Sequence, residues 1–516
     1  MRVETSSEAF EEFLTDESNA HYAEPGSVEA VYFPASESEL AEILRDASLQ
    51  KKKVTVSGAG TGVTGARVPK SGGLVVSMAE MVRIEARDGF ERVEYLGLAG
   101  PSSFLLDRSG LRAVVPPGIP LLELTGALPK TAIYPPDPTE TSAQVGGTVA
   151  TNASGARCFN YGATREWVQG LRVVLTNGDT LGVKRGKICA SPDGYFDFRS
   201  EQGNRYRFGI PTYKMPAVKH NAGLYSKPGM DLVDLFVGSE GILGAISQVE
   251  LRLAPKPGGI ASDIAFFRTG DSAMRFADWL RPMRAEGILS VEYFDENSLG
   301  FIREENPEVP EGAGGAIFFE MACGEPSSLA PIEKRLRELG STEDWCANNE
   351  RDVRGLKEFR HSLPDRVNAY LRERRSHKMG TDMAVPDGRF GEMMEAYSSA
   401  GAAFSKAFPR PGAHFVLFGH AGDCHLHFNF ISENAEELAM AKNLYVGLAE
   451  RAVSLGGTLS GEHGMGKKVL DVRGKPTPYI ELMYGRKGME EIASVKKALD
   501  PRRILNAGNV VPASHL

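Results

Sequence analysis

The sequence has few cysteines, no long apolar run and no large excess of charge of either sign. Its five cysteines stand far apart without a C-x-x-C pair, which excludes a disulfide framework, a structural zinc finger and an iron–sulfur cluster of usual spacing. No apolar run approaches the roughly 18 residues that a membrane-spanning helix needs. A net charge of -8 argues against nucleic acid as the main partner.

The first residues, MRVETSSEAF, form neither a secretory signal nor an Arg-rich transit peptide. At roughly 150 residues per folding unit, 516 residues correspond to about three units. The apolar fraction of 42% and the charged fraction of 24% are ordinary for a globular protein, which excludes a disordered or fibrous chain. We therefore expect a cytoplasmic protein, with attachment to the inner face of a membrane as the other location that the sequence allows.

Glycine, in contrast, is abundant and clustered at 58–73, 146–178 and 238–244. The first cluster contains Gly60-x-Gly62-x-x-Gly65, the dinucleotide fingerprint, but Pro69 and the glycines after it prevent the helix that a Rossmann site requires. Such a loop can still cradle a pyrophosphate with its backbone N–H groups, and a merely flexible loop is the alternative. Three clusters in one half of the chain predict one long, phosphate-bearing ligand.

The hydrophobic pattern indicates mixed α/β structure in both halves of the chain. The first half contains a helix capped at Ser36, a hairpin turning at Asn177-Gly178, and a Pro-rich stretch that predicts only loop or short turns. Beyond a proline boundary near residue 255, strands alternate with amphipathic helices as in an α/β sandwich. The expected strands cover 54–56, 74–76, 246–253, 264–267, 290–294 and 316–321, and helical stripes run through Leu329–Leu339 and Leu438–Leu455.

Histidines form the most specific pattern. Three of the ten fall within GHAGDCHLH at 419–427, and SGEHG follows at 460–464. Imidazoles with a carboxylate suit a divalent metal that keeps one position open for substrate, whereas a polar turn with structural histidines is the alternative. The same region nearly spells a P-loop, but Lys468 stands where a Ser or Thr would hold magnesium, which argues against an NTPase.

Taken in order, the motifs resemble the flavin-dependent 2-hydroxyacid dehydrogenases of the vanillyl-alcohol oxidase (p-cresol methylhydroxylase) superfamily. The branch includes D-lactate dehydrogenase, the glycolate oxidase FAD subunit and D-2-hydroxyglutarate dehydrogenase. The pieces are GAGTGVTG, PPDPTETSAQVGGTVATNASGARCFNYG, VGSEGILG, GHAGDCHLHFN, SGEHGMG and LDPRRILNAGN, and they extend from Gly58 to Asn509.

The resemblance implies an α+β fold of two domains. A two-subdomain PCMH-type FAD-binding domain would cover 1–256, with an excursion at 184–230. A C-terminal α/β substrate (cap) domain with an antiparallel sheet would cover 257–516, and its last segment, about 456–516, would return to the flavin.

The resemblance also implies the residues that hold FAD. The pyrophosphate would lie on Gly58, Gly60, Thr61, Gly62, Thr64 and Gly65; the flavin on Pro136, Gly146, Gly147, Thr151, Asn152, Gly155 and Tyr161; and the adenosine side on Glu240, Gly241 and Ile246, with Asn506 as a further cofactor residue. Members with a histidyl-linked flavin carry a His in the first Gly loop, and this chain has none. We therefore expect non-covalent FAD.

By the same resemblance, His420, His427 and Glu462 would ligate a divalent metal, zinc or manganese, and His463 would be the general base. Arg360 would bind the substrate carboxylate, and Lys378 would complete the catalytic set.

The chain departs from the family pattern in two regions, the histidine motif and the substrate-binding positions. His425 stands where the family has an amide, so it could add a ligand or replace that amide. The Thr position of the hydroxyglutarate branch is occupied by Pro364, and Lys378 lies four rather than two residues before Asp382. Both changes at the substrate positions argue against a dicarboxylate substrate.

The resemblance implies oxidation of a D-lactate-like D-2-hydroxyacid to the 2-oxoacid, with hydride transfer to FAD N5. Electrons would then pass to a separate acceptor: a quinone, a cytochrome, an electron-transferring flavoprotein or an iron–sulfur partner. A homodimer is compatible with this prediction. The alternatives are a non-redox transferase like the alkylglycerone-phosphate synthases, and a metal-dependent hydrolase without flavin, which leaves the three glycine clusters unexplained.

Overall fold

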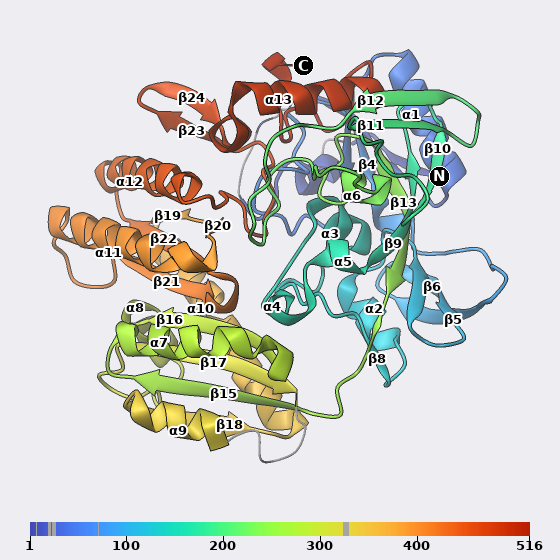
Figure 1. The fold of residues 1–516 in the computed structure, drawn as a ribbon. Coiled ribbons are helices and arrows are strands. Elements are labelled where there is room, and N and C mark those ends of the chain that lie inside the picture. Colours follow the sequence, from blue (N-terminus) through green and yellow to red (C-terminus); the bar gives the residue numbers. More distant parts are fainter. Residues whose placement is uncertain (7, 19–21, 23–26, 71, 323–329, 516) are drawn as a thin grey trace.

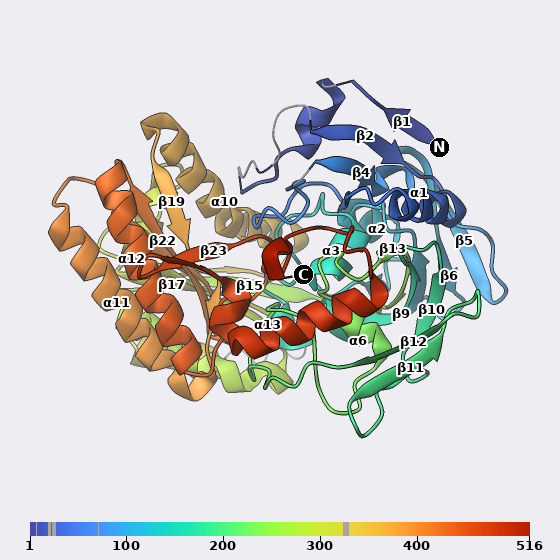
Figure 2. The same ribbon diagram turned by 90° about the horizontal axis from the view of Figure 1, so that it is seen from above.

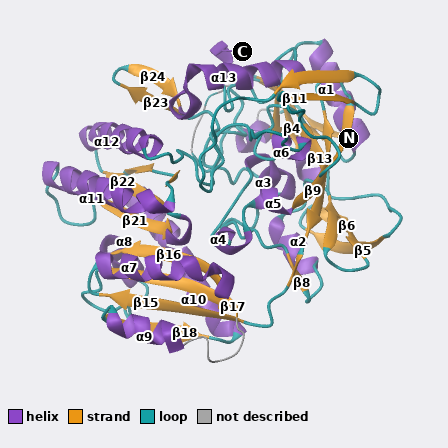
Figure 3. Cartoon of the chain, viewed as in Figure 1, coloured by secondary structure: helices purple, strands orange, loops and turns teal. Residues whose placement is uncertain are grey.

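The chain folds into two lobes in the computed structural model, which describes residues 1–6, 8–18, 22, 27–70, 72–322 and 330–515. Residues of the first half form one lobe, and most residues after 257 form the other, each built around its own sheets (Figures 1 and 3). No helix among the described residues is both long and apolar enough to cross a membrane.

The first sheet of the N-terminal lobe has four strands in the order β1-β2-β4-β3, of which β2, β4 and β3 are parallel. Helix α1 packs its apolar stripe against this sheet, and Ser36 caps it by accepting from the Glu39 backbone N–H at 3.3 Å, as the sequence predicted. The elements are β1 (Arg2–Glu4), β2 (Val28–Phe33), α1 (Glu37–Leu49), β3 (Val54–Ser57) and β4 (Gly73–Ser77), with 3-10 turns at Glu8–Phe13 and Met78–Glu80.

The second sheet has six antiparallel strands in the order β10-β9-β13-β7-β6-β5. The predicted hairpin is confirmed: β9 pairs with β10, and Gly178 adopts a φ of 84° in the turn. The strands are β5 (Phe90–Gly97), β6 (Gly100–Asp107), β7 (Arg112–Val115), β9 (Val168–Val174), β10 (Thr180–Lys184) and β13 (Ala245–Arg252).

Short helices fill the connections of this lobe. Helix α2 (Leu121–Ala127) forms where the sequence predicted only loop or turns. The prolines lie before the first turn or after the last one, and a proline in those positions leaves the helix intact. The others are α3 (Val145–Thr151), α4 (Cys158–Tyr161), α5 (Thr164–Trp167) and α6 (Leu232–Phe236), with strand pairs β8 (Ala132–Ile133)–β14 (Ala254–Pro255) and β11 (Tyr195–Arg199)–β12 (Arg205–Gly209).

The C-terminal lobe contains one eight-stranded antiparallel sheet in the order β18-β15-β17-β16-β21-β22-β19, with β20 beside β22. Helices cover both faces of this sheet (Figure 1). Ile264 and Phe266 of β15 pack toward α8 (Glu296–Arg303) and α10 (Glu350–Arg374), whereas Ala265 and Phe267 pack toward α7 (Gly270–Leu280). The strands are β15 (Ile260–Phe267), β16 (Ile288–Asp295), β17 (Gly315–Ala322), β18 (Ser341–Ala347), β19 (His377–Gly380), β20 (Met383–Ala384), β21 (Phe415–His420) and β22 (His425–Ser432).

The predicted strands at 264–267, 290–294 and 316–321 are confirmed as parts of β15, β16 and β17, and the stripe from Leu438 lies in α12. Ile332 and Leu336 of the other predicted stripe lie in α9, Leu339 directly follows the helix, and Leu329 falls outside the described residues. The helices are α7 (Gly270–Leu280), α8 (Glu296–Arg303), α9 (Ala330–Glu338), α10 (Glu350–Arg374), α11 (Phe390–Ala407), α12 (Ala435–Ser454) and α13 (Tyr479–Leu499), with a small pair β23 (Val469–Val472)–β24 (Lys475–Pro478).

The last part of the chain contacts both lobes. Helix α13 touches α12 of the C-terminal lobe and β12 of the N-terminal lobe, as the view from above shows (Figure 2). Beyond it, Leu505 forms a parallel bridge with Val54, and the Asn506 N–H donates to the Val54 carbonyl at 2.8 Å. The C-terminal segment therefore joins the edge of the first sheet.

Candidate active site

One face of the eight-stranded sheet changes from apolar to polar along its strands. Phe294 of β16 and Phe418 of β21 lie in the apolar cluster against α8 and α10, whereas Glu292 and His420, two residues away, are polar. His425 and His427 stand on β22 at the same parity, opposite β21. Because side chains alternate between the faces of a strand, these polar groups continue the same face beyond the helices that cover it.

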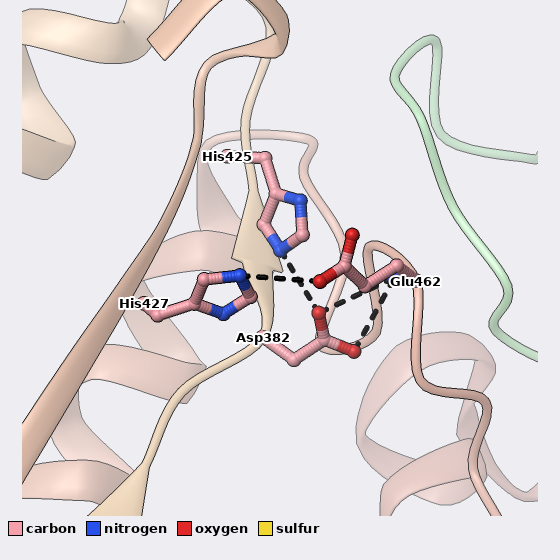
Figure 4. Close-up of side chains that lie close together, drawn as sticks. All are labelled: Asp382, His425, His427 and Glu462. Carbon is pink, nitrogen blue, oxygen red and sulfur yellow. Dashed lines mark hydrogen bonds and ion pairs between the residues drawn. The ribbon is translucent and has the colours of Figure 1, made fainter. Parts of the chain in front are cut away.

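Glu462, in the loop between α12 and β23, is the centre of the polar cluster. Its Oε2 lies 3.0 Å from His420 Nε2, and its Oε1 lies 3.2 Å from His427 Nε2 and 3.4 Å from His463 Nε2. Figure 4 shows the His427–Glu462 contact beside His425 and Asp382. The predicted metal ligands and the predicted base thus converge on one carboxylate, whose side chain is 12% exposed.

Asp382, between β19 and β20, fixes the loop that carries Glu462. Its carboxylate accepts from the Ser460 hydroxyl at 2.9 Å and from the His463 backbone N–H at 2.9 Å. It also lies 3.3 Å from His463 Nδ1 and 2.8 Å from His425 Nε2. A proton held on Nδ1 of His463 by this carboxylate leaves Nε2 of the same ring as the acceptor nitrogen.

Burial and neighbouring charges shift the pKa values of several groups in the cluster. Burial by itself would lower the pKa of His420, but Glu292, whose Oε1 is 2.7 Å from its Nδ1, and Glu462 raise that pKa to about 9. Burial would raise the pKa of Glu292, yet Arg360 and His420 lower it to about 2. His425 is fully buried, and desolvation lowers its pKa to about 3, so its imidazole is neutral.

The donor set fits a divalent ion. Ligand atoms of Asp382, His425, His427 and Glu462 all lie within 4.8 Å of one another, and His420 Nε2 lies 3.0 Å from Glu462 Oε2. Imidazole nitrogen and carboxylate oxygen are donors suited to zinc or manganese. The raised pKa of His420 means that the surrounding carboxylates stabilise an added positive charge at this place.

The two remaining predicted catalytic residues have different surroundings. Arg360, on α10, is buried, and its guanidinium donates from Nε to Glu292 at 3.2 Å and contacts His361 Nε2 at 2.9 Å. Lys378, on β19, is exposed and donates to Asn368 Oδ1 at 3.1 Å. The structure thus brings Arg360 to the cluster through Glu292, while the hydrogen bond described for Lys378 leads away from it.

Two ion-pair groups, formed mostly by half-buried side chains, join the lobes beside this cluster. Arg157, at the start of α4, forms a two-pronged pair with Glu320 of β17, with both N–O distances 2.8 Å. Lys357 of α10 contacts Asp137 of the N-terminal lobe at 2.7 Å. The cations lower the pKa of Asp137 to about 2, although burial would raise it.

The three glycine clusters meet in the N-terminal lobe. Gly58 approaches Gly147, because a Cβ placed on Gly58 would lie 3.9 Å from the Gly147 Cα. Gly60 and Gly65 adopt φ values of +88° and +70°, which favour glycine, whereas Cβ atoms on Gly62 and Gly147 would have no neighbour closer than 3.9 Å among described atoms. Space for a ligand therefore remains beside two of the predicted cofactor residues.

Other predicted cofactor residues have roles within the protein. The carbonyls of Thr64 and Gly65 accept from Lys467, Gly146 packs on Pro117, and Gly155 packs on Asp137. Thr151 donates to the Gly147 carbonyl, Asn152 forms hydrogen bonds with Asn221 and Arg165, and Tyr161 packs on Trp167. Gly241 lies beside Asn506, and Ile246 of β13 lies in the hydrophobic core. Pro136 is buried, and Thr61 is half-buried. Much of this set therefore shapes the lobe through contacts within the protein.

Glu240 ties the third cluster to the C-terminal segment. Its carboxylate accepts from the backbone N–H groups of Met465 and Gly466, both at 2.7 Å, and its carbonyl accepts from the Asn506 and Asn509 amides. Burial raises the pKa of Glu240 to about 7. These hydrogen bonds hold the loop that contains His463 against the N-terminal lobe.

Sequence reasoning did not propose Lys219, Glu292 or Asp382 as site residues. Lys219 lies in the 184–230 excursion, and its Nζ is 3.3 Å from Glu462 Oε2 and 3.7 Å from Asp423 Oδ2. Burial would lower its pKa, but these carboxylates raise it to about 12. No local motif marks these three residues, since each reaches the site from a segment far away in the sequence.

Comparison with known proteins defines first a class: flavoproteins of the FAD-linked oxidase type. The family described as "FAD binding domain" matches residues 28–184, and that described as "FAD linked oxidases, C-terminal domain" matches residues 257–510. The chain belongs to the FAD-linked oxidases, as the ordered motifs predicted.

Two curated relatives and one solved structure extend this result. Glycolate oxidase subunit GlcD of Bacillus subtilis is 27% identical over 93% of this chain and 88% of its own length. A D-lactate dehydrogenase of Anaerostipes hadrus is 27% identical over 99% of this chain and 94% of its own. An alkyldihydroxyacetonephosphate synthase structure shares the fold, with a TM-score of 0.65 at 15% identity over 98% of this chain and 82% of that one.

Proposed function

We propose that the chain is an FAD-dependent dehydrogenase that oxidises a D-lactate-like D-2-hydroxyacid to the 2-oxoacid. The observation that supports this most is the convergence of His420, His427 and His463 on the carboxylate of Glu462. Relatives of near full length are named for D-lactate dehydrogenase and glycolate oxidase activities. FAD supplies the hydride acceptor, and it is held non-covalently, because the first Gly loop has no His to link it.

His463 takes the proton of the substrate hydroxyl at Nε2. Its Nδ1 faces Asp382 at 3.3 Å, so the ring is oriented with Nε2 toward the Glu462 side, where the substrate hydroxyl would lie. His420, His427 and Glu462 would hold zinc or manganese, which supplies a Lewis acid for the hydroxyl oxygen. Arg360 would orient the substrate carboxylate through a guanidinium edge that Glu292 does not occupy.

The proposed reaction requires an electron acceptor, and the proposal also includes a cellular location and an oligomeric state. Electrons leave to a separate acceptor, for which a quinone, a cytochrome, an electron-transferring flavoprotein or an iron–sulfur protein is suitable. The predicted cytoplasmic location and homodimer are kept as parts of this proposal. Lys378 is kept as a substrate contact only for acids long enough to reach β19.

The visible spectrum of the purified protein tests the proposal first. Flavin bands, bleached anaerobically by D-lactate but not by L-lactate, would support it. Flavin that no 2-hydroxyacid bleaches would favour the non-redox transferase, and a colourless protein that reconstitutes with no FAD would overturn both. Trichloroacetic acid should release the flavin, whereas a yellow pellet would contradict non-covalent binding.

Elemental analysis tests the ion separately. We expect about one zinc or manganese per chain, and activity that chelation removes and metal restores while the flavin spectrum stays unchanged. His420→Ala and His427→Ala should lose both ion and turnover. A fully active protein without a divalent ion would leave His463 as the base acting alone.

A further inference from the structure

Lys219 places a buried positive charge directly on the proposed ion site. Its side chain is 7% exposed, and its Nζ lies 3.3 Å from Glu462 Oε2, the oxygen that His420 Nε2 contacts at 3.0 Å. The lysine comes from the N-terminal lobe, whereas Glu462 and His420 belong to the C-terminal lobe. One carboxylate oxygen thus receives an ammonium from one lobe and an imidazole from the other.

A second carboxylate stands within reach of the same ammonium. Asp423, in the turn between β21 and β22, has a side chain that is 10% exposed, and its Oδ2 lies 3.7 Å from Lys219 Nζ. This oxygen is buried and has no hydrogen-bond partner among the described residues. Asp423 can therefore accept a full hydrogen bond from Lys219 if the ammonium moves by a small rotation of its chain.

Lys219 is not needed to hold the Glu462 backbone. The Asn221 side-chain amide donates to the Glu462 carbonyl at 2.7 Å, and the Asn221 N–H donates to the Ser460 carbonyl at 2.8 Å. Asn221 is itself held by Asn152 at 2.8 Å. The contact of Lys219 acts instead on the charge of the Glu462 carboxylate.

Two cations that contact the same carboxylate oxygen repel each other electrostatically. An ion bound by His420 and Glu462 would lie a few ångströms from the ammonium, and in a buried site this repulsion outweighs the worth of one lysine–carboxylate contact. We propose that the ammonium of Lys219 competes with the ion for the Glu462 carboxylate. It pairs with Glu462 when the ion is absent and with Asp423 when the ion is bound. This role rests on the ion of the proposed function and gives the 184–230 excursion a part in it.

The test is the zinc affinity of the FAD-loaded full chain, measured by competition with a chromophoric chelator. Lys219→Met should tighten zinc binding by at least about tenfold, because it keeps the apolar stem and removes the charge. Lys219→Arg keeps the charge and should bind zinc as the natural protein does. Lys214→Met, an exposed lysine of the same excursion, is the matched control and should change nothing.

Asp423→Asn completes a double-mutant cycle. Alone it should weaken zinc binding several-fold, since the ammonium loses its second partner, and in the Lys219→Met background it should have little effect. Weaker or unchanged binding in Lys219→Met would overturn the proposal, as would equal tightening by Lys219→Arg. If neither the natural chain nor Lys219→Met binds zinc, both the ion site and the proposed role of Lys219 are overturned. Bleaching of the flavin by D-lactate tests the dehydrogenase activity independently of that result.

Discussion

The two lobes approach their expected ligands with different chemistry. In the N-terminal lobe, the predicted FAD residues are largely glycines and small side chains, and no atom of the described residues lies closer than 3.9 Å to a Cβ placed on Gly62 or Gly147. In the C-terminal lobe, the site consists of buried and half-buried imidazoles and carboxylates around Glu462. The first surface can therefore be disrupted by adding atoms, and the second by removing them.

Adding atoms to the glycine surface should have the largest effect. Among the described residues, the new Cβ in Gly62→Val would have Asp16 Oδ2 as its one neighbour within 4 Å, at 3.9 Å, so the chain should fold, while the branched side chain fills the predicted pyrophosphate space. We expect folded, flavin-free and inactive protein, measured by the ratio of flavin to protein absorbance. Gly126→Val, at an exposed position of α2 with equal room, is the control; a full flavin content in Gly62→Val would remove this loop from the cofactor site.

Removing the base should be nearly as severe. His463→Ala should slow flavin reduction by D-lactate about 10²–10⁴-fold, because the hydroxyl proton loses its acceptor, while FAD and ion remain bound. Rapid anaerobic mixing measures this step directly. His515→Ala, at an exposed histidine near the C-terminus, should leave the rate unchanged. A variant at 463 that reduces its flavin at the natural rate would assign the proton to another group.

A smaller effect is expected at Arg360. Arg360→Lys keeps the positive charge beside Glu292 but loses the guanidinium edge, so the KM for D-lactate should rise about tenfold with flavin retained. Arg366→Lys, on the same helix and paired with Glu304 and Glu305, is the matched control. Equal KM values for the two variants would show that Arg360 serves only to hold Glu292.

The ion pairs between the lobes should contribute a modest, pH-dependent stability. The pKa of Asp137 is depressed from 3.8 to about 2 in the folded protein, so its contribution is present above pH 4 and is lost as pH falls through 2. Between about pH 7 and about pH 3, roughly 1 kcal/mol should disappear. Urea unfolding of the natural chain and of Asp137→Asn measures it: their difference should shrink at low pH, and a constant difference would contradict the assignment.

Local patterns were sufficient for much of the fold. Ser36 capping α1 and the Asn177-Gly178 turn were predictable because each depends on residues that are neighbours in the chain. Helix α2 is not predictable in this way, because a Pro-rich segment indicates loop although prolines outside a helix leave it intact. The family was predictable from the residues of the motifs and their order along the chain, because neither depends on the tertiary structure.

The site itself divides in the same way. The sequence alone determined that imidazoles and a carboxylate recur at short spacing, at His420–His427 and Glu462–His463, and that glycines cluster where a nucleotide could lie. Only the tertiary structure decided that Lys219, Glu292 and Asp382 contact these groups. The physical reason is that spacing along one strand or loop fixes neighbours within it, whereas a charge from a distant segment arrives only when the two lobes pack together.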